Sequence, residues 1–173
     1  MSVANSLKAV AVVLATLVPA QAALAKDELV INLVNEPATL DPHMQWNPDS
    51  YYVYRNIFDN LVTRNDDGKI VPQVAESWKQ ISDTELEMDI RSGITFHDGE
   101  ALTADDVVYS VKRITDPDFS SPQLGQFNSI VDARKVDEDT VILVTSEPYP
   151  ALMAQLVKLS VVPEHVASEL GKE

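Results

Sequence analysis

Aromatic and polar side chains gather between residues 44 and 52, directly before a segment with helical periodicity. The sequence there is Met44-Gln45-Trp46-Asn47-Pro48-Asp49-Ser50-Tyr51-Tyr52. A loop that presents backbone groups and aromatic rings at the start of a helix can line a ligand cleft. We therefore expect Gln45, Trp46 and Asn47 to contact a ligand. The alternative, that Trp46 packs the loop against a sheet, stays open.

The other reactive side chains do not form a catalytic or metal-binding motif in the sequence. The three histidines, His43, His97 and His165, lie far apart, and none has a second ligand type at metal spacing. The acidic clusters, such as Asp137-Glu138-Asp139, lack the ligand order of a calcium loop. We find no nucleophile elbow, phosphate loop or dinucleotide fingerprint. The sequence therefore predicts a protein that is not an enzyme and that holds neither a metal nor a cofactor.

The charge and the missing cysteines limit the possible partners. The chain has 173 residues, a net charge of -14 and no cysteine. Because such an acidic surface repels phosphate backbones and anionic lipids, we do not expect nucleic acid or a membrane surface as a partner. Without cysteine there is no disulfide, no thiol catalysis and no lipid attachment site after a signal. We expect a monomer.

The first 25 residues have the layout of a secretory signal. Lys8 supplies a positive charge, residues 9–18 are apolar, and Ala23-Leu24-Ala25 is a small-residue cleavage site. The apolar run is far shorter than the roughly 20 residues that a membrane span needs. We therefore predict that residues 1–25 are removed and that the mature protein is not inserted in a membrane.

Hydrophobic periodicity and turn residues predict interleaved strands and helices. We expect a strand over residues 28–34, a helix that Asp49 or Ser50 caps, a helix that starts at Thr103, and a loop over residues 118–128. Hairpins are expected around residues 65–68, 78–90 and 131–145, and short helices around residues 152–156 and 163–170. The predicted inward faces are formed by Val53, Ile57 and Leu61, by Leu86, Met88 and Ile90, and by Val107, Val108, Val111 and Ile114. This pattern predicts an α/β architecture.

Several motifs in fixed order resemble those of one protein family. They are Glu36-Pro37-x-x-Leu40-Asp41-Pro42-His43, residues 56–62, residues 68–78, residues 90–99 and residues 102–110. Together they resemble the family 5 extracellular solute-binding proteins, which are the oligopeptide- and dipeptide-binding components of bacterial ABC importers. The chain departs from the family pattern at Thr84, where a glycine usually follows the preceding aspartate, and at Met88, where an aromatic residue is usual.

The resemblance implies a fold of the periplasmic-binding-protein type II kind, with two α/β lobes joined by a hinge. Residues 26–59 would begin the first lobe, residues 60–161 would form its extra mixed α/β subdomain, and residues 162–173 would return to the first lobe. The chain would then hold an incomplete first lobe. The second lobe, which in peptide-binding relatives carries most side chains that fix the peptide ends, would lie outside it.

The resemblance also implies a function. We expect a periplasmic protein, not a lipoprotein, that captures peptides or a similar small solute and delivers them to an ABC transporter permease. Within the same fold, a nickel complex, haem, an opine or a sugar are alternative ligands. Two other hypotheses remain: an exported hydrolase whose catalytic part lies outside this chain, and a natural short form that acts as an interaction module. We expect that such a short form folds poorly by itself.

Overall fold

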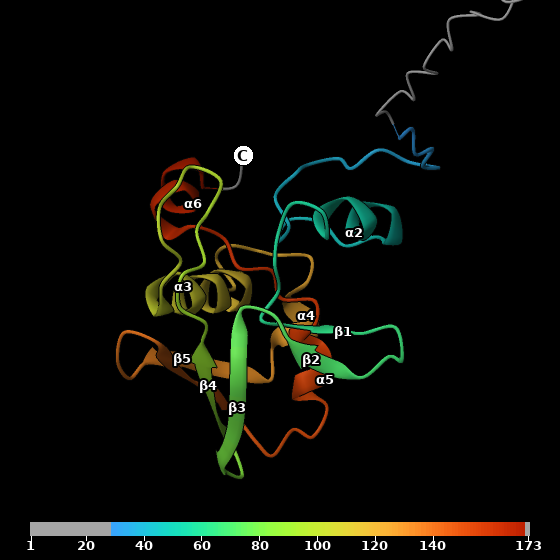
Figure 1. Ribbon diagram of the computed structural model, residues 1–173. Helices are drawn as coiled ribbons and strands as arrows, with labels where there is room; N and C mark the ends of the chain where they lie inside the picture. Colours follow the sequence, from blue (N-terminus) through green and yellow to red (C-terminus); the bar gives the residue numbers. More distant parts are fainter. Residues whose placement is uncertain (1–28, 172–173) are drawn as a thin grey trace, which may run out of the picture. The chain divides into compact units, whose positions relative to one another are not determined.

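A four-stranded antiparallel sheet with the strand order β3-β4-β6-β5 is the larger of the two sheets in the described residues (Figure 1). Its strands are β3 (Ala75–Ser82), β4 (Glu85–Ile90), β5 (Ile130–Lys135) and β6 (Thr140–Thr145). The computed structural model describes residues 29–171, and residues 29–32 belong to a separate N-terminal unit. The sheet consists of the two predicted hairpins, β3–β4 and β5–β6, which pair with each other through β4 and β6.

The sheet has one buried face, which follows from the alternation of apolar and polar residues along β4. Leu86, Met88 and Ile90 are buried, and the residues between them are partly exposed. Val141 and Leu143 of β6 extend the same apolar face. Because successive side chains of a strand point to opposite faces, this pattern places the hydrophobic core on one side of the sheet. On the other side, Ile142 of β6 is also buried. The predicted inward face of this hairpin is confirmed.

Helix α3 (Ala104–Thr115) packs against β5 and β6. Its buried residues include Val107, Val111 and Ile114, three members of the predicted stripe, whereas Val108 is only half-buried. The Asp106 carboxylate accepts hydrogen bonds from the backbone N–H and the hydroxyl of Thr103, both at 2.9 Å. This arrangement closes the helix N-terminus, where backbone N–H groups would otherwise lack partners.

The remaining elements are short. They are the hairpin of β1 (Val62–Arg64) and β2 (Ile70–Pro72), and the helices α2 (Pro48–Tyr54), α4 (Leu124–Phe127), α5 (Leu152–Leu156) and α6 (Glu164–Leu170). Gly68 has a φ of 77° in the turn of the β1–β2 hairpin, a backbone conformation that favours glycine. The three predicted hairpins and the helices around residues 152–156 and 163–170 are confirmed.

Three details of the predicted secondary structure are wrong. Residues 29–34 form no strand, because no other described segment pairs with them, and a strand needs such a partner for its backbone hydrogen bonds. Helix α2 begins at Pro48, so its cap is Asn47 and not Asp49 or Ser50. It ends at Tyr54, so Ile57 and Leu61 of its predicted inward face lie beyond the helix. The segment 118–128, predicted as a loop, contains the single turn of α4.

The mixed α/β fold class is confirmed. The predicted signal, residues 1–25, lies outside the described residues. Between residues 29 and 171, no helix is both long and apolar enough to cross a membrane. The predicted division at residues 59 and 161 stays a prediction. An isolated antiparallel bridge between Asn60 and Ser160 brings these two positions side by side.

Candidate functional site

The predicted ligand-binding loop leads from a buried segment, residues 41–43, to the N-terminus of α2. The Asn47 Oδ1 atom accepts a hydrogen bond from the Ser50 backbone N–H at 2.8 Å and so caps the helix. The Gln45 Oε1 atom accepts from the Ala38 backbone N–H at 3.0 Å and from the Tyr54 hydroxyl at 3.3 Å. Both side-chain oxygens therefore have partners within the protein, and the role of Gln45 and Asn47 as ligand contacts stays a prediction.

Trp46 differs from its two neighbours, because ring contacts hold it and no hydrogen bond of its side chain is formed with residues 29–171. The indole ring lies 5.4 Å from the Tyr51 ring, between centroids and at an interplanar angle of 56°. The Lys158 Nζ atom lies 4.5 Å from the centroid of the same indole. Trp46 is only half-buried, so part of the ring remains available to a ligand.

Hydrogen bonds from two buried side chains to three backbone carbonyl groups fix the path of the loop. The Gln123 Nε2 atom donates to the Pro42 carbonyl at 2.5 Å and to the Gln45 carbonyl at 3.1 Å. The Ser121 hydroxyl donates to the His43 carbonyl at 2.6 Å. Gln123 and Ser121 are both buried. A buried polar side chain that bonds the backbone of a loop restricts its conformations, so these two residues fix the shape of the loop before any ligand arrives.

Arg113 of α3 anchors the segment before the loop. Its guanidinium donates to both carboxylate oxygens of Asp41, at 3.0 and 2.6 Å, and to the Gly171 carbonyl at 2.5 Å. The Arg113 Cζ atom lies 4.1 Å from the centroid of the Phe119 ring. Burial alone would raise the pKa of Asp41, but the hydrogen bonds and the charge of Arg113 outweigh burial and hold that pKa below its ordinary value.

His43 completes this buried network as a neutral imidazole. Its Nε2 atom lies 2.8 Å from the Ser160 carbonyl, and its Nδ1 atom lies 3.2 Å from Arg113 Nη1. The carbonyl needs a donor and the guanidinium needs an acceptor, so the proton resides on Nε2. Complete burial lowers the pKa of His43 to about 4, and the Arg113 charge acts in the same direction. His43 therefore acts as a structural link between the loop and residue 160.

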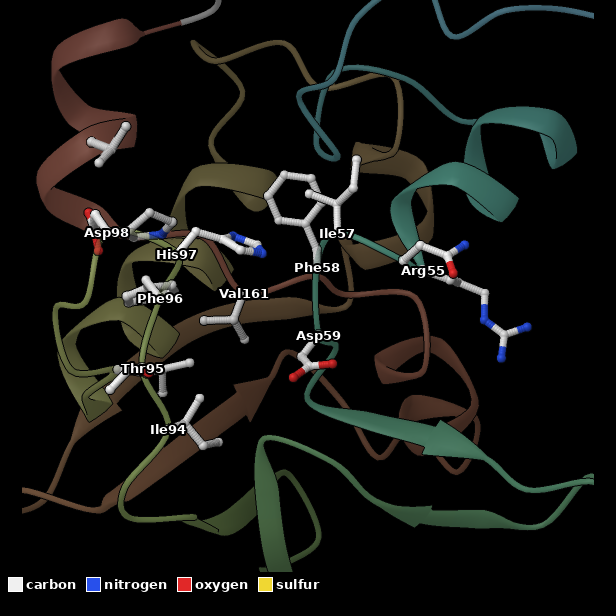
Figure 2. Close-up of a pocket in the computed structure, with 14 residues that line it drawn as sticks. Arg55, Ile57, Phe58, Asp59, Ile94, Thr95, Phe96, His97, Asp98 and Val161 are labelled. Atoms are coloured by element: carbon white, nitrogen blue, oxygen red, sulfur yellow. The ribbon is translucent and has the colours of Figure 1, made fainter. Parts of the chain in front are cut away.

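A cavity of about 410 Å³ lies beside α2 and α6 (Figure 2). Its lining is largely apolar and includes Ile57, Phe58, Ile94, Phe96, Val161 and Val166, with Arg55, Asp59, His97 and Asp98 as its charged or titratable members. Gln45, Trp46 and Asn47 do not line it. Within residues 29–171, no group of three histidine or acidic side chains could hold a metal ion.

One wall of this cavity is held to α6 by an exposed ion pair. The His165 Nε2 atom lies 2.7 Å from a carboxylate oxygen of Asp98, and the His165 ring meets the Phe96 ring edge to face at 6.3 Å. The hydrogen bond with Asp98 raises the pKa of His165, and the same bond lowers the pKa of Asp98. His97 is exposed in the turn of residues 97–98.

Known proteins share both the sequence pattern and the fold. A family model described as "Bacterial extracellular solute-binding proteins, family 5 Middle" matches residues 69–173. The chain belongs to this family. Its relatives include the periplasmic murein peptide-binding protein MppA of Escherichia coli (strain K12), which is 31% identical over 90% of this chain and 33% of its own length. The periplasmic oligopeptide-binding protein OppA of the same organism is 31% identical over 94% of this chain and 34% of its own length.

A solved structure matches the fold directly. The structure of AgaA from A. tumefaciens R10 in complex with agropinic acid superimposes with a TM-score of 0.73 and 34% identity. The match covers 78% of this chain and 28% of AgaA. The chain spans about a third of the length of the curated relatives that it matches. The predicted family and fold are thereby confirmed, and the described residues form part of the family fold.

Sequence reasoning missed most of the side chains that hold the loop. Arg113 did carry a signal, because Asp106, Ser110 and Arg113 are spaced at i, i+4 and i+7 and so lie on one face of α3 that is buried. A buried arginine needs a partner, and Asp41 is that partner. Ser121, Gln123 and Lys158 carried no comparable signal, because their partners lie in segments far away in the sequence.

Proposed function

We propose that this chain is part of a periplasmic binding protein that captures peptides, or a similar small solute, for delivery to an ABC import permease. The chain itself performs no catalysis in this proposal. Two relatives whose names specify peptide ligands, MppA and OppA, support the choice of ligand. The loop at residues 44–47 is this chain's contribution to the ligand cleft.

One observation carries the proposal for the site: buried side chains hydrogen-bond the backbone of the loop and of the segment before it, while part of the Trp46 ring stays exposed. Gln123 and Ser121 bind one carbonyl group of the loop and two of the segment directly before it, and Asp41 of that segment is fixed by Arg113. A site that is shaped before binding loses less conformational entropy when the ligand arrives. A half-exposed indole on such a support offers a large apolar contact to a peptide side chain or backbone.

The mechanism follows from the two-lobed fold of the family. The ligand would bind to one lobe, and a second lobe, outside this chain, would close over it and exclude bulk water. Closure is favoured only by contacts that the ligand makes in the closed state. A rigid loop on the first lobe gives the second lobe a fixed surface against which to close. The closed form would then dock on the permease as a monomer.

An opine is the second candidate ligand, and a specific match favours it. AgaA, solved with agropinic acid, is 34% identical to this chain over the superimposed part. A nickel complex, haem and a sugar remain as further ligands that the fold could take. An exported hydrolase would require catalytic residues beyond this chain, and turnover of a peptide substrate by the purified native protein would establish it in place of the transport proposal.

The proposal is tested with the complete native protein, whatever its length. A ligand raises the melting temperature because it stabilises the folded state by RT ln(1 + [L]/Kd). We expect a pool of synthetic tripeptides to raise the melting temperature and agropinic acid to have a smaller effect. A rise with agropinic acid alone would establish the opine alternative, and no rise with either would contradict the proposal.

The mass of the native protein tests whether the protein has the second lobe that this mechanism needs. We expect the protein purified from the periplasm to be several times heavier than residues 26–173, because a two-lobed mechanism needs a second lobe. A mass equal to that of residues 26–173 would contradict the two-lobed mechanism and favour the interaction module.

A further inference from the structure

Two cations and two aromatic rings form a row at the proposed ligand loop. The Lys158 Nζ atom lies 4.5 Å from the centroid of the Trp46 ring, and the Trp46 ring lies 5.4 Å from the Tyr51 ring. The Arg55 Cζ atom lies 5.5 Å from the centroid of the Tyr51 ring. The row therefore runs from one cation through both rings to the other cation. Cations prefer such positions over aromatic faces.

The Lys158 ammonium is not fully satisfied within the described residues. It has three donors, of which one reaches the Gln126 Oε1 atom over a long 3.4 Å and another faces the indole. Among residues 29–171, no carboxylate forms an ion pair with Lys158 or with Arg55. Lys158 is half-buried, so the missing partner is not fully replaced by water.

Two acidic residues that lie close in the sequence to Tyr51 and Arg55 have hydrogen-bond partners elsewhere. Asp49 accepts a hydrogen bond from the Asn35 side chain at 2.7 Å, and Asp59 accepts one from the Gln73 side chain at 2.6 Å. In Figure 2, the Arg55 side chain extends away from His97 and Asp98. The chain has a net charge of -14, so two cations that lack a counter-ion among residues 29–171 are an exception to the overall negative charge.

We infer that Lys158 binds a carboxylate group of the ligand beside Trp46, which makes Lys158 a specificity-determining residue of the proposed site. This inference rests on the proposed function. An acidic protein repels an anionic ligand at long range, so such a ligand needs a local cation to bind. The Lys158 ammonium supplies that charge, and the indole under it supplies an apolar contact for the atoms next to the carboxylate. The ligand class is therefore a peptide or related solute with a free carboxylate.

The experiment uses the complete native protein and two matched pools of synthetic tripeptides, one with free C-terminal carboxylates and one amidated. The variant Lys158→Met removes the charge and keeps most of the aliphatic stem over the indole. We expect the variant to need a concentration of the carboxylate pool about 10-fold higher or more for half-maximal stabilisation, because it loses a hydrogen bond to a charged group. We expect little change with the amidated pool, and restoration of most of the affinity by Lys158→Arg.

The control is Lys79→Met, which makes the same charge change on the exposed surface of β3. It should affect neither pool. If Lys158 only positioned the indole, Lys158→Met would weaken both pools equally, and that result would overturn the inference while leaving peptide binding intact. A wild-type protein that prefers the amidated pool would overturn it as well. A wild-type protein stabilised by neither pool would overturn the peptide proposal and this inference together.

Discussion

Arg113 and Asp41 form a buried bidentate ion pair that joins α3 to the segment before the proposed ligand loop. Their side chains are only 7% and 8% exposed, and the two residues lie 72 positions apart in the sequence. Planar guanidinium and carboxylate groups can form two parallel hydrogen bonds, which fixes their orientation as well as their distance. The position of the loop therefore depends on a helix that packs against the sheet.

Removal of the guanidinium should strongly destabilise the fold. Arg113→Met leaves the Asp41 carboxylate buried without its main partner, and breaking a buried pair in this way costs about 3–5 kcal/mol. Urea unfolding of the complete native protein measures the loss. The control is Arg134→Met, because the ion pair of Arg134 with Glu85 is partly exposed to solvent and should contribute no more than about 1 kcal/mol. Equal losses in the two variants would contradict the assigned role of Arg113.

His43 should make the protein less stable as the pH falls. Its pKa is about 4 in the folded protein, against an ordinary value of 6.5, so the unfolded state binds more protons between these values. The free energy of unfolding should then decrease between pH 6.5 and pH 4, by up to about 3 kcal/mol. The pKa of Asp41 is also lowered, so the stability that this carboxylate contributes is lost at still lower pH.

The measurement for His43 is the slope of unfolding free energy against pH in the wild type and in His43→Gln. We expect the slope between pH 6.5 and pH 4.5 to become flatter in the variant. His165→Gln is the control, because the raised pKa of His165 gives a contribution present at low pH and lost as the pH rises above its folded pKa. An unchanged slope in His43→Gln would show that another group titrates in this range.

Local patterns in the sequence predicted the elements that depend on nearby residues. The alternation of Leu86, Met88 and Ile90 predicted the β3–β4 hairpin, and the spacing of Val107, Val111 and Ile114 predicted α3. A strand depends on its neighbour as well as on its own residues, and residues 29–34 have no such neighbour in the described structure. Their alternating apolar pattern was therefore insufficient.

The candidate site was predictable only in part, for a physical reason. The aromatic and polar content of residues 44–47 indicated a binding loop, but Asn47 also had a capping pattern, and the structure uses its side chain as the α2 cap. Gln123 contacts the loop and the segment before it across 78 and 81 sequence positions, and Lys158 contacts Trp46 across 112 positions. Contacts over such distances are set by the packing of elements, and a single sequence does not encode them in a local pattern.

Gln123 should couple the stability of the loop to ligand affinity. Gln123→Met removes both N–H donors to the Pro42 and Gln45 carbonyls and leaves these buried acceptors without that partner. We expect a loss of about 1–3 kcal/mol in unfolding free energy and weaker binding of the tripeptide pool, because the loop loses its fixed shape. The control Gln80→Met removes an exposed hydrogen bond to the Ser82 carbonyl and should change neither quantity appreciably. Unchanged binding in Gln123→Met would show that Gln123 does not contribute to the proposed binding site.

The two tryptophans should respond to the same substitution in opposite ways. Trp78 is partly buried against the hydrophobic core, whereas Trp46 contacts Tyr51 and Lys158 at the proposed cleft. Trp46→Leu should weaken tripeptide binding about 10-fold or more with a small change in stability, because a ligand contact is lost. Trp78→Leu should lower the unfolding free energy by about 1–3 kcal/mol and leave the affinity unchanged, because only core packing is lost. Calorimetric titration and urea unfolding of both variants measure the two quantities. If Trp46→Leu lost stability and kept its affinity, Trp46 would be a packing residue, and the cleft would have to be sought elsewhere on this lobe.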